Sequence, residues 1–452
     1  MPHGPVCRDR ARADAVTLRP GRGFSNSLLR DPDGLRLFVS QLFAQFGYSM
    51  ALVALPWLVL SQGGSTGVAA LSVTAILVPY VVLALFAGVI GDRFPRKRLL
   101  VSAYTWQAAA AIMIPVAALS GPVPLGLILT VSVLIGLGRV FVDAATFGAI
   151  AEIVKPAQFL EAQAALTVAF GAGIIAGPLL SGVLIGVAGG AAAIAGQAAC
   201  LTCGAVVAFT ISRSLSAAIV DRHAQTRARD AAWDGLALIW REPTLRLLTG
   251  VAFVWFALVQ GTTQSGLVAY LRVEVVLDAQ AVGLTMGLAG LAGVTGGLTV
   301  GALAERVGGA WLIAVGIVAS GLAVVGLSGV HDRWTAVLVV ALLFFSIQVL
   351  LTSLVGERQR RAPIHMQSLV GVTGRACSVL GSMAGGLMLS GLSTLVSLRT
   401  LYFSFGVAVI VMAAWAVPAI FRAIAAPASP AIAPQEAPAA VPAGGEGVTG
   451  TG

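Results

Sequence analysis

Residues 88–98 of the chain read GVIGDRFPRKR and join two long apolar runs. The first run closes at Asp92, a short turn rich in Arg and Lys follows, and a second apolar run begins. Asp92 can stabilise the N-terminus of a neighbouring helix, and the cations can pair with acids or with anionic lipid headgroups. The stretch therefore predicts two membrane-spanning helices joined by a tight cationic turn.

The composition extends this prediction to the whole chain. Of 452 residues, 58% are hydrophobic and 10% are charged, whereas a typical soluble chain is about 25% charged. Helices in lipid need no polar coat, because lipid is itself apolar. The net charge of +9 raises the question of nucleic-acid binding. The basic residues, however, lie mostly between apolar runs and form no stripe with interleaved aromatics, so we expect no nucleic-acid partner.

The apolar runs number twelve, each long enough to cross a bilayer as a helix. We predict an all-α membrane protein with twelve transmembrane helices. The expected organisation is a cytoplasmic tail 1–35, a six-helix bundle 36–211, a cytoplasmic central loop 212–246, a second six-helix bundle 247–421 and a disordered cytoplasmic tail 422–452. The expected spans are 36–61, 68–91, 99–120, 124–147, 160–186, 189–211, 247–271, 280–303, 309–329, 334–356, 367–392 and 397–421.

Charge distribution predicts the orientation of these spans. With the N-terminus in the cytoplasm, only Arg272, Arg333 and Arg399 of the 28 basic residues fall in outer loops. Arg139 and Arg375 fall within spans, and all others lie on the cytoplasmic side. Cytoplasmic loops of membrane proteins carry an excess of Lys and Arg. We therefore expect a multi-pass protein of the cell membrane with both termini in the cytoplasm.

Two segments of the first half recur in the second. The sequence GVIGDR at 88–93 corresponds to GALAER at 301–306, an offset of 213 residues. The sequence GPLLSG at 177–182 corresponds to GLMLSG at 386–391, an offset of 209 residues. Nearly equal offsets predict two pseudo-symmetric six-helix bundles. Repeats of this kind are typical of transporters, which bind substrate at the repeat interface.

These motifs resemble those of the major facilitator superfamily. The segment 88–98 looks like motif A of that family, although the family usually has Gly where this chain has Pro95. On this resemblance the expected latch consists of Gly88, Asp92, Arg93, Arg96 and Lys97. The fifth span resembles motif C, the antiporter motif that tracks export in the family, with Gly173, Gly177, Pro178 and Gly182.

Residues 30–420 as a whole resemble the macrolide-efflux-like branch of drug:proton antiporters. The resemblance implies a central cavity lined by spans one, four, seven and ten, and alternating access to the two sides of the membrane. Proton antiport is part of the same expectation.

The ionisable residues inside the expected spans are Arg139, Asp143 and Arg375. Such residues are functional candidates, because a charge in lipid costs several kcal/mol unless it is paired. Arg139 and Asp143 are four residues apart, share one helix face and can neutralise each other. Two roles stay open for Asp143: a latch partner of Arg96, which the resemblance suggests, or the proton carrier.

The candidate cavity residues are polar or aromatic positions of the lining spans. Amides and aromatics with few fixed charges suit a bulky amphipathic ligand. The alternative for each position is that it packs between helices. Besides Arg139, the candidates are Gln45, Tyr48, Trp255, Gln260, Gln264 and Gln348.

We therefore expect a monomeric exporter of a small drug-like or natural-product molecule, with protons and membrane lipid as its other partners. The alternative is a dedicated exporter of a native metabolite such as a siderophore. An enzyme is not expected, because the sequence has no HExxH motif, no nucleotide-binding loop and no cluster of His or Asp. We likewise expect no cofactor, metal or catalytic residue.

Overall fold

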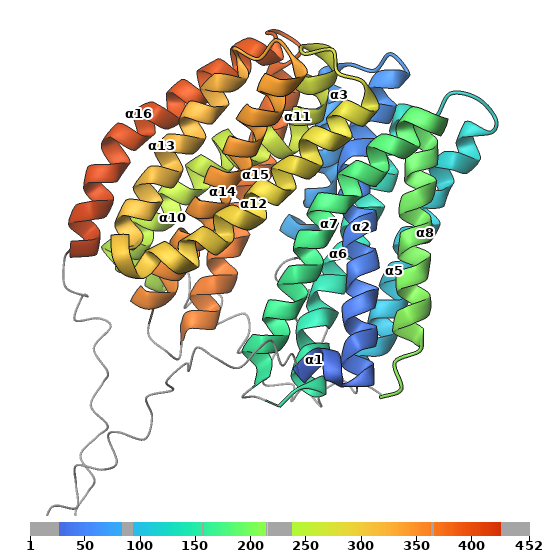
Figure 1. Ribbon diagram of the computed structural model, residues 1–452, viewed down its shortest axis with the longest axis horizontal. Helices are drawn as coiled ribbons and strands as arrows, with labels where there is room; N and C mark the ends of the chain where they lie inside the picture. The colour runs from blue at the N-terminus through green and yellow to red at the C-terminus, as the bar shows by residue number, and fades with distance from the viewer. Residues whose placement is uncertain are drawn as a thin grey trace, which may run out of the picture.

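The computed structural model describes residues 27–83, 94–155, 158–213, 215, 237–362 and 366–425. All regular elements in these ranges are helical (Figure 1). The first half contains α1 (Ser27–Arg30), α2 (Pro32–Ser61), α3 (Thr66–Thr74) continued by η2 (Ala75–Leu77), α5 (Arg96–Ala118), α6 (Leu125–Ile153), α7 (Phe159–Ala188) and α8 (Gly190–Phe209). The second half contains α10 (Pro243–Trp255), η4 (Phe256–Gly261), α11 (Thr262–Val273), α12 (Ala279–Val307), α13 (Gly309–Leu327), α14 (Arg333–Arg361), α15 (Gln367–Leu392) and α16 (Leu398–Ala425).

Eleven helical segments among these residues are long and apolar enough to cross a membrane. Two of them are composite, because α3 and η2 continue to Leu83 and because α10, η4 and α11 form one span from Pro243 to Val273. The helix α15 is 26 residues long, and with it the long helical segments among the described residues number twelve. This arrangement confirms the predicted all-α fold class.

Several helices begin or end outside the expected limits. The helix α2 begins at Pro32, not at residue 36, because the Asp31 carboxylate accepts hydrogen bonds from the backbone N–H groups of Asp33 (2.9 Å) and Gly34 (3.3 Å). An Asp at the N-cap with Pro directly after it is a strong helix start. Likewise α10 begins at Pro243, inside the expected central loop, and α14 extends to Arg361.

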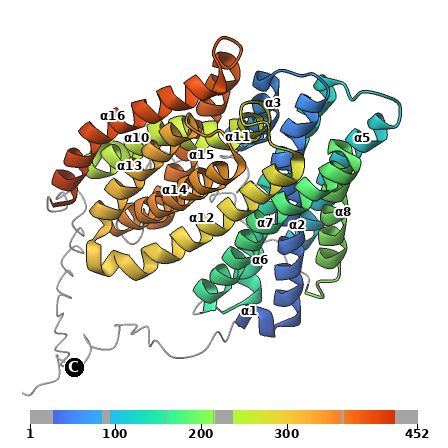
Figure 2. The same ribbon diagram turned by 45° about the horizontal axis from the view of Figure 1, so that its top comes forward.

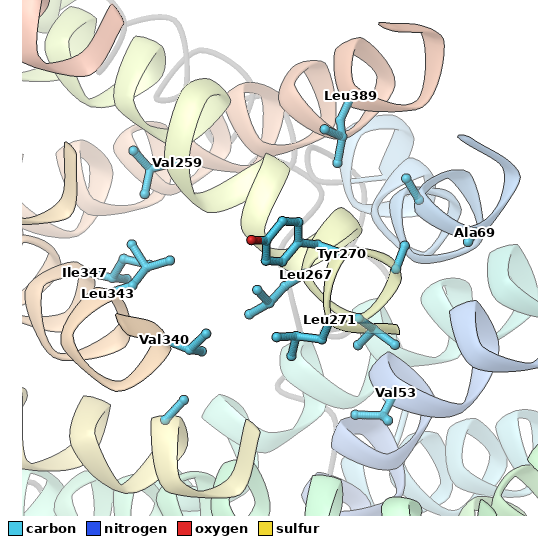
Figure 3. Close-up of a cluster of buried hydrophobic side chains, with 14 of the residues drawn as sticks. Val53, Ala69, Val259, Leu267, Tyr270, Leu271, Val340, Leu343, Ile347 and Leu389 are labelled. Carbon is cyan, nitrogen blue, oxygen red and sulfur yellow. The ribbon is translucent and has the colours of Figure 1, made fainter. Parts of the chain in front are cut away.

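The largest cluster of buried hydrophobic side chains extends across both bundles. This cluster joins residues of α2 and α3 to residues of α11 and α15. Figure 3 shows part of it, where Val53 and Ala69 lie on one side and Leu267, Leu271 and Leu389 lie on the other. Apolar packing therefore holds the two halves together at this level of the molecule.

Two helix pairs cross from one bundle to the other, and the sequence repeat relates them. The helix α7, the fifth span, packs on α12, the eighth, and α3, the second span, packs on α15, the eleventh. Both contacts use small residues. A Cβ built on Gly283 of α12 would lie 2.8 Å from the Cα of Gly182 on α7, and the Ser390 hydroxyl donates to the carbonyl oxygen of Gly67 at 2.8 Å. Small residues allow this close approach of helices.

The bundles converge at one end and diverge at the other. Figures 1 and 2 both show α3 and α11 side by side, whereas the end that holds α1 stands away from the C-terminal bundle. At the convergent end, Arg272 of α11 donates to the carbonyl oxygen of Trp57 of α2 at 2.8 Å.

Candidate functional site

Asp143 lies at the centre of a charge cluster between the bundles. Its Oδ1 is 3.2 Å from Nε of Arg139, one turn earlier on α6. The hydroxyl of Tyr80, which follows η2, donates to Oδ2 at 2.6 Å. Nη2 of Arg375 on α15 lies 3.6 Å from the same oxygen. All three charges expected inside the membrane therefore meet at one carboxylate, and Arg375 brings the second bundle to it.

Arg139 is held firmly on the side of the N-terminal bundle. It is 6% exposed, and its guanidinium carbon lies 4.7 Å from the ring centroid of Tyr48 and 5.6 Å from that of Phe170. A buried cation needs a carboxylate and further favourable contacts to offset its loss of hydration. The pair with Asp143, together with the two rings, meets this need.

Arg375 is held much more weakly. Its side chain is 64% exposed, whereas those of Asp143 and Arg139 are 18% and 7% exposed. Exposed ion pairs contribute about 0–1 kcal/mol. Asp143 therefore has a buried cationic partner on its own helix and a more exposed cationic partner across the bundles.

Asp143 does not pair with Arg96 in this structure, although such a pairing was one of the two roles left open for Asp143. The guanidinium of Arg96 instead contacts Glu152 in an ion pair and donates to the carbonyl oxygen of Gly148 at 2.6 Å. Both groups lie near the end of α6, roughly one and a half and two and a half turns beyond Asp143. A Cβ at Gly148 would collide with the guanidinium of Arg96. Arg96 can therefore lie against α6 here because Gly148 has no side chain.

The other expected motif A residues are placed only in part. Gly88, Asp92 and Arg93 lie outside the described residues. Lys97 is on the first turn of α5, and its Nζ donates to the carbonyl oxygen of Ile211 at 2.5 Å. This bond ties the start of α5 to the chain segment directly after α8.

The expected motif C residues are contact points on two faces of α7. Gly173 and Gly177 face α2, where added Cβ atoms would lie 2.5 Å from the Cβ atoms of Gln45 and Ser49. Gly182 faces α12 instead, and the carbonyl oxygen of Pro178 lies on that face too, against Gly283. The small residues thus let α7 pack closely on its own bundle and on the other bundle at once.

The expected cavity residues divide into two groups. Tyr48 of α2 and Gln264 of α11 come close to each other across the bundles. Gln260 lies four residues before Gln264, on a π-helical turn, and its buried Oε1 has no hydrogen-bond partner. Such turns are frequent at functional sites. These three residues lie on spans one and seven, which were expected to line the cavity.

The remaining three candidates pack within a bundle. Trp255 is fully buried and its Nε1 donates to the hydroxyl of Ser320 at 2.9 Å, so it joins α10 to α13 and does not line a cavity. Gln45 is 2% exposed against Gly173 of α7. Gln348 packs against Gly297 of α12.

Sequence reasoning missed Tyr80 and Arg358, and it placed Glu152 in a loop as an alternative acid for proton coupling. Tyr80 is the one tyrosine of the second apolar run, and a lone hydroxyl group in an apolar span could have marked it as a candidate. Glu152 lies beyond the expected span 124–147, but α6 extends to Ile153 and therefore includes it. Arg358 was counted as a loop cation, but it is 6% exposed and donates to the carbonyl oxygen of Leu248 at 3.1 Å.

The fold and this cluster define a class of protein: a helical membrane protein of two related six-helix bundles, joined by an ion pair between Asp143 and Arg375. The family model described as Major Facilitator Superfamily matches residues 37–363, and the chain belongs to this superfamily.

Known proteins agree with this assignment. The chain is similar to the multidrug efflux pump Tap of Mycolicibacterium fortuitum, with 31% identity over 232 residues, which are 50% of this chain and 56% of the pump. The match thus spans about half the length of this curated relative.

Solved structures share the fold at low sequence identity. The nucleoside transporter NupG (D323A mutant) superposes with a TM-score of 0.72 at 12% identity, over 86% of this chain and 99% of that chain. A bacterial homolog of the human lysosomal transporter Spinster, in an inward-facing and unoccupied conformation, gives 0.66 at 15% identity, over 90% and 98%.

Proposed function

We propose that this protein is a secondary active transporter that exports a small amphipathic drug-like or natural-product molecule by alternating access, coupled to protons through Asp143. The observation that carries the proposal is the position of Asp143. It is a carboxylate bonded to Arg139 in its own bundle and to Arg375 in the other. The direction of transport is supported by the similarity to a multidrug efflux pump.

Protonation of Asp143 would change the contact between the bundles. A neutral carboxyl no longer attracts the exposed guanidinium of Arg375, whereas Arg139 keeps the rings of Tyr48 and Phe170. A ligand shifts a conformational equilibrium only by binding the two states differently. A proton on Asp143 would bind the two states differently, because only the ionised carboxylate favours the state in which Arg375 lies close to it.

The substrate in this proposal contacts Tyr48, Gln264 and Gln260. They offer an aromatic face and amide groups without a net charge, and the unpartnered Oε1 of Gln260 is an acceptor for a donor group of the substrate. Neutral polar groups beside an aromatic ring suit weakly charged amphipathic molecules. We place both termini in the cytoplasm, in keeping with the distribution of basic residues.

The test is export from an efflux-deficient bacterial host. Cells that express the chain are loaded with a panel of fluorescent dyes and antibiotics, and efflux is measured with and without a proton uncoupler. We expect efflux that stops when the uncoupler is added. Efflux that persists would eliminate proton antiport. No efflux of any panel compound, with loss of a secreted native metabolite on deletion of the gene, would favour the dedicated exporter.

The substitution Asp143→Asn tests whether Asp143 carries the proton. The variant should lose efflux driven by a pH gradient but retain exchange down a substrate gradient in proteoliposomes. Asp278→Asn is the matched control, because Asp278 caps α12 by accepting from the N–H of Ala281 at 2.7 Å and Asn caps equally well. Efflux driven by a pH gradient at the wild-type rate in Asp143→Asn would remove Asp143 from this role.

A further inference from the structure

Residues of α5 and of the end of α8 line a groove. Figures 1 and 2 show these two helices on the side of the N-terminal bundle remote from the C-terminal bundle. The volume of the groove is about 940 Å³, and it adjoins a second hollow of about 260 Å³ that shares Val101, Thr105 and Phe209 as lining residues. From Arg98 to Ala109 the lining follows α5 for roughly 16 Å, at about 1.5 Å of rise per residue. The groove lies far from the Asp143 cluster and is no part of it.

The mouth of the groove is basic. Lys97, Arg98 and Arg213 line it. Arg213 is partly neutralised by Asp31, 2.6 Å from its Nη2. Lys97 donates a hydrogen bond to the backbone carbonyl oxygen of Ile211 and lies 5.3 Å from the ring centroid of Phe209. Arg98 is exposed, and within the described part of the chain no carboxylate pairs with either Lys97 or Arg98. Among the described residues, these two positive charges thus have no carboxylate partner.

The rest of the groove is apolar. Small side chains such as those of Ala108 and Ala205 leave the hollow between the helices. Larger side chains form its walls and remain open to the surroundings: Phe209 is 69% exposed, Val206 60% and Trp106 47%. A surface of this kind suits a hydrocarbon chain.

We propose that this groove binds an anionic phospholipid, with the phosphate headgroup on Lys97 and Arg98 and one acyl chain along α5 and α8. Charge complementarity supports the headgroup position, since basic pockets at the ends of membrane helices bind anionic lipid headgroups. The apolar length distinguishes a lipid from a free anion, which would need only the mouth. Lys97 and Arg98 directly follow Arg96, so the lipid would also fix the end of α5 from which Arg96 reaches α6.

The test is native mass spectrometry of the full chain released from nanodiscs of phosphatidylglycerol or phosphatidylcholine. We expect phosphatidylglycerol to be retained preferentially. K97Q/R98Q should lower its apparent affinity by roughly tenfold or more, because each surface cation contributes about 1 kcal/mol to binding of anionic lipid. The matched control is R306Q/R360Q, which removes two exposed cations at the ends of α12 and α14 and should retain wild-type affinity. Size-exclusion chromatography and thermal unfolding establish that each variant is folded.

A second variant separates the lipid from a free anion. Ala109→Trp fills the apolar part of the groove and leaves the cations intact, so it should reduce retention of phosphatidylglycerol. Three results would overturn the proposal: equal loss in K97Q/R98Q and R306Q/R360Q, equal retention of both lipids, or displacement by inorganic phosphate with no effect of Ala109→Trp.

Discussion

Arg272 of α11 lies against Trp57 of α2, with its guanidinium carbon 4.0 Å from the ring centroid and its Nη1 2.8 Å from the carbonyl oxygen of the same residue. The contact joins the two bundles at their convergent end. The Asp143–Arg375 pair joins them nearer the divergent end. An alternating-access cycle would have to break and remake the first contact while it alters the second.

Arg272→Ala should weaken the convergent end. A cation–π contact and a charged hydrogen bond together contribute about 2 kcal/mol, so the population opened at this end should rise. Pulsed electron resonance between spin labels at the ends of α3 and α11 measures the separation. Arg333→Ala is the control, because Arg333 lies over the ring of its neighbour Trp334 and not over the other bundle. Identical distance distributions in both variants would show that the Arg272 contact does not keep the convergent end of the bundles closed.

Arg375→Gln should uncouple the position of the bundles from pH. The variant lacks the cation that the ionised Asp143 attracts, so protonation no longer changes the cross-bundle contact. The pH dependence of the label distances near α6 and α15 should flatten, and Arg375→Lys should restore part of it, since Lys keeps the charge but not the planar fork. A pH response of wild-type size in Arg375→Gln would contradict the coupling scheme.

Gly283→Leu should force α12 away from α7. A Cβ at this position would lie 2.7 Å from the carbonyl oxygen of Pro178, and overpacking of this kind costs about 1–3 kcal/mol. Thermal stability in detergent and efflux should both fall. Gly301→Leu on the same helix is the control, because a Cβ there meets nothing within 4 Å. Similar losses in both variants would point to helix propensity, not to the cross-bundle contact.

Arg96 and Glu152 should behave as a coupled pair. In a double-mutant cycle on efflux rates, Arg96→Gln and Glu152→Gln should be non-additive by about 0.5 kcal/mol or more, the range for residues in contact. Arg96→Gln combined with Asp143→Asn should be additive within about 0.5 kcal/mol. If Arg96 were instead coupled to Asp143 and additive with Glu152, Asp143 and not Glu152 would be the partner of Arg96.

Hydropathy and helix capping allowed most of the fold to be predicted. The expected span 367–392 coincides with α15, and the shift of α2 to Pro32 follows from a cap, Asp31, that is visible in the sequence. The proximity of Arg139 and Asp143 could also be predicted, because residues four apart on a helix always share a face.

The candidate site was only partly predictable. The cavity candidates were polar or aromatic positions on the spans that the family resemblance predicts to line the cavity. Residue type does not determine how a helix is rotated about its axis. Trp255 therefore turned out to be bonded to Ser320 inside its bundle. Tyr80, on a span that was not expected to line the cavity, donates to Asp143.

The sequence by itself determined that the chain crosses a membrane about twelve times as two related bundles. The free energy of transferring a helix into lipid is a sum over its own residues, so each span can be recognised from its local sequence. Only the tertiary structure decided that Asp143 meets Arg375, that Arg96 meets Glu152 and that a basic groove opens between α5 and α8. These contacts join residues far apart in the chain, and they depend on how close small residues such as Gly148 and Gly283 let the helices come.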